Sequence, residues 1–174
     1  MTKEKTQNSI SSRITDYLIL VKTRPVVKRL KHSMNFPVPS KVISKVMVIL
    51  PRNLALLDQA SIFVQSLRKT FPAWRVELFD VDKLDRTDLN RMQLPRQEVL
   101  DRLRKADYQF VLDLNDGNDR ISSYIALMTE APYRLHMRSD GKMFYNISYQ
   151  PQNTNGEYYY EPLLNYLRRL FVKS

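Results

Sequence analysis

The chain of 174 residues has no cysteine, only two histidines and only three glycines. Without cysteine, the sequence excludes a disulfide scaffold, a thiolate metal site and a cysteine nucleophile. Two histidines are too few for a multi-histidine metal centre, and three scattered glycines cannot form a glycine-rich phosphate loop. We therefore expect neither a metal site nor a bound cofactor.

Long apolar runs are also missing. The first twelve residues are polar, and the apolar run 17–21 is too short for the core of a signal peptide. No stretch approaches the roughly 20 apolar residues that a membrane span requires. We expect a cytoplasmic protein, and peripheral attachment at the inner face of the membrane stays open.

Positive charge is plentiful and unevenly placed. Residues 1–45 carry ten lysines and arginines against two acids, so they hold +8 of the net +10, and residues 46–174 hold +2. Such an arm indicates an anionic partner, such as nucleic acid, the ribosome or acidic lipid. It is equally consistent with solubility and docking of the arm onto the body. The candidates for contact with an anionic surface are Arg13, Lys22, Arg24, Lys28, Arg29 and Lys31.

The sequence of the arm predicts two short helices. Residues 1–9 are polar and are expected to lie outside any element. A first helix is predicted over 11–22, and a second helix restarts at Pro25 and ends near Lys31, because proline is tolerated in a first helical turn. Pro37 and Pro39 then indicate an extended linker. We divide the chain into a basic helical arm with its linker, 1–41, and a domain, 42–174.

Apolar strands and amphipathic helices alternate through the domain. The predicted strands are 46–50, 75–81, 108–114, 133–137 and 143–149, and the predicted helices are 53–70, 96–105, 119–130 and 161–172. Alternation of this kind is typical of a parallel sheet covered by helices through right-handed crossovers. The fold class is therefore α/β: a single Rossmann-like three-layer domain with a mostly parallel sheet of about five strands, preceded by the basic arm.

Polar side chains follow the third predicted strand. Asp113, Asn115, Asp116 and Asp119 fall within seven residues, and Arg120 comes next. The carboxyl ends of parallel strands are where open α/β sheets bind ligands, so these five residues are candidates for holding a cation or a sugar. The alternative is a polar loop in which Asn118 or Asp119 caps the next helix.

Three segments resemble glycosyltransferase family 9, the heptosyltransferases: 50–72, 107–115 and 119–135. The chain also resembles short bacterial proteins that carry a basic helix before such a domain. The resemblance implies the acceptor-binding half of a two-domain enzyme, in which an aspartate after a glycine acts as the base. Asp58 lies near that position and is the candidate for a remnant base, but no glycine precedes it and no donor half is expected. An exposed carboxylate early in a helix is the alternative for Asp58.

These observations lead to three expectations about function. The first is a non-catalytic, glycosyltransferase-like half-domain that acts as a binding or scaffold module, with its arm on an anionic membrane surface or a protein partner, a second copy included. The second is a subunit of a split glycosyltransferase. The third is a nucleic-acid or ribosome-associated protein bound through phosphate charge.

Overall fold

The structure, a computed structural model, describes residues 2–30, 34–137, 143–150 and 160–172, with residues 2–12 as backbone only. The helices are α1 (Thr2–Arg29), α2 (Leu57–Thr70), α3 (Gln97–Lys105), α4 (Arg120–Met128) and α5 (Glu161–Leu170). The strands are β1 (Val38–Pro39), β2 (Lys45–Ile49), β3 (Arg75–Phe79), β4 (Phe110–Asp113), β5 (Tyr133–His136), β6 (Ile147–Ser148) and β7 (Phe171–Val172). Short 3-10 turns are η1 (Ser40–Val42), η2 (Leu54–Leu56) and η3 (Val81–Lys83).

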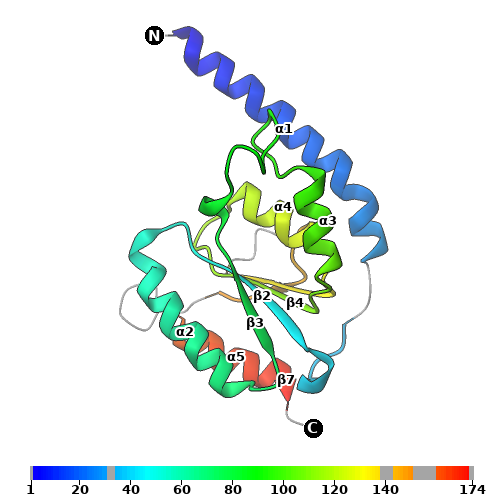
Figure 1. Ribbon diagram of the computed structural model, residues 1–174, viewed down its shortest axis with the longest axis vertical. Helices are drawn as coiled ribbons and strands as arrows, with labels where there is room; N and C mark the ends of the chain where they lie inside the picture. Colours follow the sequence, from blue (N-terminus) through cyan, green and yellow to red (C-terminus); the bar gives the residue numbers. More distant parts are fainter. Residues whose placement is uncertain (1, 31–33, 138–142, 151–159, 173–174) are drawn as a thin grey trace.

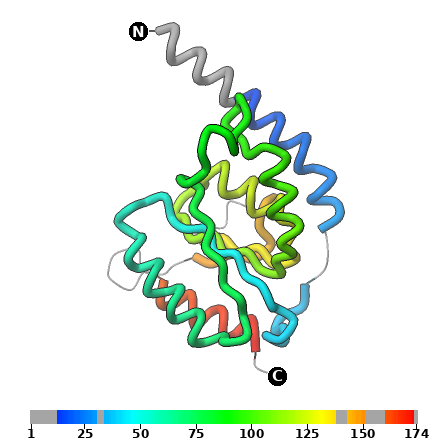
Figure 2. Tube along the Cα trace, in the orientation of Figure 1, coloured from blue at the N-terminus to red at the C-terminus, as the bar shows by residue number. Residues whose placement is uncertain are grey.

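Five strands form one parallel sheet in the order β3-β2-β4-β5-β6. Helices α2 and α5 cover one face, α3 and α4 cover the other, and α1 lies outside α4 (Figure 1). The tube in Figure 2 follows the same path, with the chain crossing the sheet from layer to layer. The predicted α/β fold with a parallel sheet of five strands is confirmed.

The central strand β2 shows why these residues form a buried sheet. Val46 and Val48 pack toward α2 and α5, whereas Met47 and Ile49 pack toward the layer of α3 and α4. All four are fully buried, so neither face of β2 needs polar residues. Each such side chain contributes about 1.5–3 kcal/mol of hydrophobic free energy. The continuous apolar run in the sequence is therefore the signature of a strand covered on both sides.

The predicted arm of two helices is wrong. Residues 2–29 form one helix, and Pro25 lies inside it. Proline removes one backbone hydrogen bond from a helix interior, which disfavours continuation. Here Val26 and Ile19 are both buried against α4, on either side of the proline. Tertiary packing on both sides therefore outweighs the local cost, and the helix continues to Arg29.

The end of the chain also differs from the prediction. The last helix was expected to reach residue 172, but α5 ends at Leu170. Phe171 and Val172 form β7, which pairs in parallel with Val38 and Pro39 of β1. Phe171 is buried beside Trp74, with ring centroids 5.3 Å apart. The segment expected to be a linker thus contributes a strand to the body.

The predicted fifth strand is shortened. Residues 143–149 were expected to be extended, but only Ile147 and Ser148 form β6. Arg134 is the physical reason, because its Nε donates to the carbonyl of Phe144 at 2.8 Å and its backbone N–H donates to Asn146 Oδ1 at 2.8 Å. The Phe144 carbonyl and the Asn146 side chain are thereby held by Arg134, and backbone bonding to β5 begins with the Asn146 N–H, which donates to the Arg134 carbonyl at 3.1 Å. Burial lowers the pKa of Arg134 to about 10.

Candidate functional site

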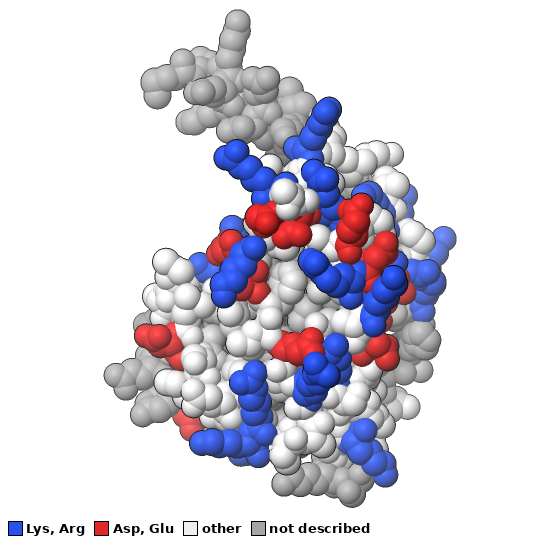
Figure 3. Space-filling model, in the orientation of Figure 1, with Lys and Arg blue, Asp and Glu red and all other residues white. Residues whose placement is uncertain are grey.

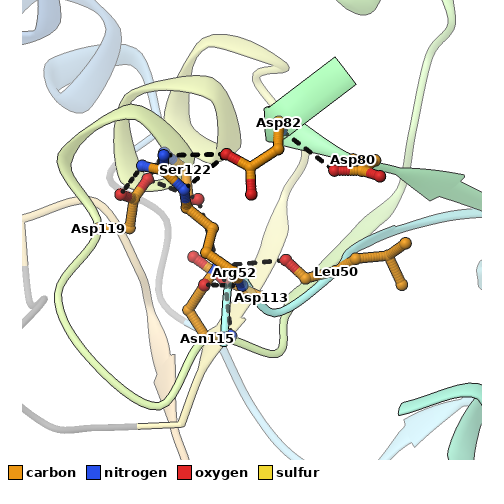
Figure 4. A network of polar contacts seen from close by, with 8 residues as sticks. All are labelled: Leu50, Arg52, Asp80, Asp82, Asp113, Asn115, Asp119 and Ser122. Carbon is orange, nitrogen blue, oxygen red and sulfur yellow. Dashed lines mark hydrogen bonds and ion pairs between the residues drawn. The ribbon is translucent and has the colours of Figure 1, made fainter. Parts of the chain in front are cut away.

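The strand order creates one switch point in the sheet. β2 and β4 are neighbours, but the chain leaves β2 toward α2 on one face and leaves β4 toward α4 on the other (Figure 1). Open α/β sheets bind ligands in the crevice at the carboxyl ends of two such strands. Asp113, Asn115 and Asp119, three of the residues predicted after the third strand, lie at this point beside the loop after β2 (Figure 4).

Asp113, the last residue of β4, is fully buried. It accepts hydrogen bonds from the Tyr145 hydroxyl, from the backbone N–H of Asn115 at 3.0 Å and from Asn115 Nδ2 at 2.7 Å. Burial raises the pKa of Asp113, and the hydrogen bond from Tyr145 and the proximity of His136 oppose that rise. Its carboxyl group therefore points into the domain and holds neighbouring segments together.

Asn115 connects the two loops of the switch point. Its Oδ1 accepts the backbone N–H of Arg52 at 2.9 Å, and its Nδ2 also donates to Ser122 Oγ at 3.2 Å. The side chain is nearly buried, so these bonds replace bonds to water. Asn115 is therefore a structural link between the loop after β2, the loop after β4 and α4.

Asp119 is the N-cap of α4, as the alternative interpretation of the sequence held. Its Oδ1 accepts the backbone N–H of Ser122 at 2.7 Å and the Ser122 hydroxyl at 2.8 Å. Its Oδ2 forms an ion pair with Arg52 at 2.8 Å. Burial raises the pKa of Asp119, but the bonds from Ser122 and Arg52 outweigh burial and hold that pKa below its usual value.

Arg52 is the residue that the sequence prediction missed. Its guanidinium bridges Asp119 and Asp82, with the second ion pair at 2.9 Å. The hydrogen bond and charge of Asp119 raise the pKa of Arg52. Arginine after a strand has no distinctive spacing, so the only sequence signal was one positive charge beside a cluster of acids. At the switch point, the Arg52 side chain extends from the loop after β2 toward Asp119 and Asp82 (Figure 4).

Three other candidate residues do not bond to the network of Asp113, Asn115, Asp119 and Arg52 within the described part of the chain: Asp116, Arg120 and Asp58. Asp116 is exposed and accepts from Asn53 Nδ2 at 3.2 Å, at the edge of the crevice. Arg120 points instead to the arm and pairs with Asp16 at 2.8 Å. Asp58 is exposed in the first turn of α2, and within the described residues no hydrogen bond or ion pair links it to the network. Of the predicted ligand-binding residues, the crevice thus brings together Asp113, Asn115, Asp116 and Asp119.

The basic residues of the arm lie on a helix that is docked along one side. Arg13, Lys22, Arg24, Lys28 and Arg29 are exposed, and Lys31 lies outside the described residues. Arg29 is also held by an ion pair with Glu130 at 2.6 Å. On the face of the body seen in Figure 3, basic side chains are intermixed with acidic ones, as expected from its net charge of +2. The excess positive charge therefore belongs to α1 and its flanking segments.

Two further findings bear on the chemistry of the site. In the part of the chain that the structure describes, no three histidine, aspartate or glutamate side chains are grouped so that they would hold a metal ion. None of the described helices combines the length and the apolar character needed to cross a bilayer.

A scan against protein-family models found no match to this chain, and searches of curated proteins and of solved structures found none either.

Proposed function

We propose that this protein is a non-catalytic Rossmann-like binding module that attaches to an anionic membrane surface through the outer face of α1. The observation that carries the proposal is the exposure of apolar side chains among basic ones on that face. Tyr17 is 66% exposed, and Ile14 and Val21 are each 46% exposed. Exposed apolar side chains that line up on one face indicate a contact with a second surface.

The outer face is a continuous stripe of the helix. Ile14, Tyr17, Val21, Arg24 and Lys28 follow one another at alternating spacings of three and four residues, so they lie on one side of α1. The opposite side carries buried residues that pack against the domain: Thr15, Ile19, Thr23 and Val26. The domain therefore holds α1 by one face and presents the other face outward.

The composition of the outer face favours a lipid surface over nucleic acid. Interfacial helices insert aromatic and aliphatic side chains between lipids while lysine and arginine contact the headgroups. Each basic side chain near an anionic surface contributes roughly 1 kcal/mol of binding free energy. Binding to phosphates of nucleic acid would use the charge but leave Ile14 and Val21 unburied. The charge of +8 over residues 1–45 suits either anionic partner, so the exposed apolar side chains decide the choice.

The switch point supports the non-catalytic part of the proposal. A catalytic crevice presents polar groups toward the substrate. Here Asp113, Asn115 and Asp119 are each engaged by side chains or backbone of the domain itself, and Arg52 bridges the opening. Asp113 and Asn115 are also buried, so a ligand could reach them only if these hydrogen bonds broke first.

Sedimentation of the full chain with lipid vesicles tests the proposal. Vesicles with about one-third anionic phosphatidylserine should bind the protein, neutral phosphatidylcholine vesicles should bind it at least tenfold more weakly, and added salt should reduce binding. Replacement of three outer-face residues together, Ile14→Ser, Tyr17→Ser and Val21→Ser, should abolish binding. The matched control is Leu54→Ser with Ile62→Ser, two exposed apolar residues of the α2 region, which should bind like the wild type.

A second pair of variants tests the charge. One variant neutralises four exposed basic residues of the arm, Arg13, Lys22, Arg24 and Lys28, to glutamine. Its control neutralises four exposed basic residues of the body, Lys69, Lys83, Arg86 and Lys105. The proposal is wrong if both variants lose vesicle binding equally, or if the apolar triple variant binds as tightly as the wild type.

A further inference from the structure

A pocket of about 530 Å³ lies between the arm and the domain. It is lined by α1, by the start of α4 with the loop before it, and by the residues ahead of β6. The lining residues are Asp16, Ile19, Leu20, Asn118, Asp119, Arg120, Ser123, Met143 and Phe144. Pockets that bind small molecules typically have volumes of roughly 300–1,000 Å³, and this one falls within that range.

One wall of the pocket is apolar. Ile19 and Leu20 contribute it from α1, and Met143 and Phe144 contribute it from the segment before β6. Leu20 and Met143 are each 37% exposed, so the wall opens toward solvent. On the helix surface, Leu20 neighbours Tyr17 and Arg24, three and four residues away. The apolar wall is therefore continuous with the outer face of α1.

The polar end of the pocket contains an ion pair that joins the arm to the domain. Arg120 donates from Nε to Asp16 Oδ1 at 2.8 Å and from Nη2 to Asp16 Oδ2 at 3.1 Å. This two-point geometry is the one with which a guanidinium holds a carboxylate or a phosphate. Both side chains are about half exposed, so an incoming anion can exchange with Asp16. The other carboxylate of the lining, Asp119, is neutralised by Arg52.

We infer that this pocket binds one anionic amphiphile, with its carboxylate or phosphate head on Arg120 and its apolar chain along the wall that contains Leu20 and Phe144. The head takes the place of the Asp16 carboxylate on the guanidinium. Ser123 and Asn118 also line the pocket and are the further polar residues available to the head. The inference rests on the proposed function for the source of the ligand, since α1 on an anionic bilayer brings lipid to the mouth of the pocket.

Titration calorimetry on the full chain, without vesicles, tests the inference. The probes are dihexanoyl phosphatidic acid, octanoate and dihexanoyl phosphatidylcholine, each kept below its micelle concentration. We expect saturable binding with one site for at least one of the two anionic probes and none for phosphatidylcholine. Binding of the phosphate alone would indicate a phospholipid ligand, and binding of the carboxylate alone would indicate a fatty acid.

Two variants separate recognition by Arg120 from general effects on the arm. Arg120→Gln should weaken binding about tenfold, the loss expected for one charge-assisted contact. Arg29→Gln removes a second ion pair between arm and domain, the one with Glu130. Arg29 lies outside the pocket, so this variant should bind like the wild type. Leu20→Ser should also weaken binding, because it removes apolar contact with the chain of the amphiphile.

The inference and the proposed function fail in distinguishable ways. If neither anionic probe binds while anionic vesicles still do, the pocket is not a lipid site and the proposed function stands. If a probe binds but vesicles do not, the pocket stands and attachment through the outer face of α1 is wrong. Equal binding of phosphatidylcholine, or unchanged affinity in Arg120→Gln, would overturn recognition of the anionic head.

Discussion

The switch point of the sheet and the outer face of α1 were both predicted as sites from their polar or charged residues. In the structure, the residues of the switch point contact one another, whereas those of the outer face are exposed. At the switch point, Asp113, Asn115 and Asp119 find their partners within the domain. On α1, Tyr17 and Val21 remain exposed beside basic residues. The comparison teaches that polar residues that are close in the sequence can be used up by buried contacts within the domain, whereas side chains that stay exposed remain available to a partner.

Geometry explains the difference. Two loops and the start of α4 converge at the carboxyl ends of β2 and β4, so each polar side chain there lies within reach of several others. A helix packed on a domain by one face cannot bury the opposite face in the same way. Burial at the switch point therefore follows from the crossing of segments, and exposure on α1 follows from its position outside the layer of α3 and α4.

The largest expected effect comes from breaking the switch point at its centre. Asn115→Ala removes the bridge between the two loops and leaves buried partners without hydrogen bonds, which should lower the free energy of unfolding by about 3 kcal/mol. The matched control, Asn53→Ala, removes an exposed amide that caps η2 and contacts Asp116, and should cost about 0.5–1 kcal/mol. Urea unfolding followed by circular dichroism measures both. Equal losses would show that Asn115 is not a central link.

Tyr145→Phe tests the buried carboxyl group and adds a pH dependence. The Tyr145 hydroxyl favours the charged form of Asp113, so its removal raises further a pKa that burial already raises. In the folded variant, Asp113 then keeps a proton that the unfolded chain releases above about pH 4. The free energy of unfolding therefore falls as the pH rises above about 4. We expect a loss of about 2 kcal/mol at pH 7 and a smaller loss at pH 4.

The control for this prediction is Tyr166→Phe, which also removes a phenolic hydroxyl group. The Tyr166 hydroxyl donates to the carbonyl of Ser148 at an exposed position. It should change the free energy of unfolding by less than about 0.5 kcal/mol at either pH. A loss in Tyr145→Phe that is the same at pH 4 and pH 7 would contradict the role assigned to Asp113.

A substitution in the seam between arm and domain sharpens the contrast between the two faces of α1. Val26→Ala removes two buried methyl groups and should lower the free energy of opening of α1 by about 1.5 kcal/mol. Val21→Ala makes the same change on the outer face, where it should have almost no effect. Hydrogen exchange of the α1 amides measures both, with the amides of β2 as the internal reference. Similar exchange in the two variants would mean that α1 is not held by the inner face.

The smallest expected effect is that of the Arg52 side chain. Arg52→Gln removes two partly exposed ion pairs, which should cost less than about 1 kcal/mol and less still at high salt. The backbone N–H of Arg52 keeps its bond to Asn115, so the centre of the network survives. Unfolding in urea at low and high salt measures the effect. A salt-independent loss as large as that of Asn115→Ala would show that the guanidinium, and not the amide, holds the crevice closed.

Local patterns predicted most elements of the domain but not the ends of the chain. The apolar runs of β2 and β4 predicted strands that are buried on both faces of the sheet. The amphipathic pattern of α2 predicted a helix that is buried on one face, because the two kinds of burial leave different periods in the sequence. The single helix across Pro25, the strand at Phe171 and the shortened β6 depended on contacts with distant segments. Such contacts leave no local pattern.

The candidate site shows the same division. The capping role of Asp119 was recognisable because its partner is three residues away. Asp113 and Asn115 also have distant partners: the Tyr145 hydroxyl for Asp113 and the backbone N–H of Arg52 for Asn115, each more than 30 residues away. Whether those polar groups face a ligand or each other was therefore beyond any argument from spacing.

By itself, the sequence determined the absence of cysteine chemistry, the α/β fold class and the concentration of positive charge in the first 45 residues. Composition and periodicity are properties of the chain, so they hold in any conformation. Only the tertiary structure decided that the switch point is closed by its own residues, that Arg120 pairs with the arm, and that Tyr17 and its neighbours face outward. Those outcomes depend on which distant segments the fold brings within hydrogen-bonding and packing distance.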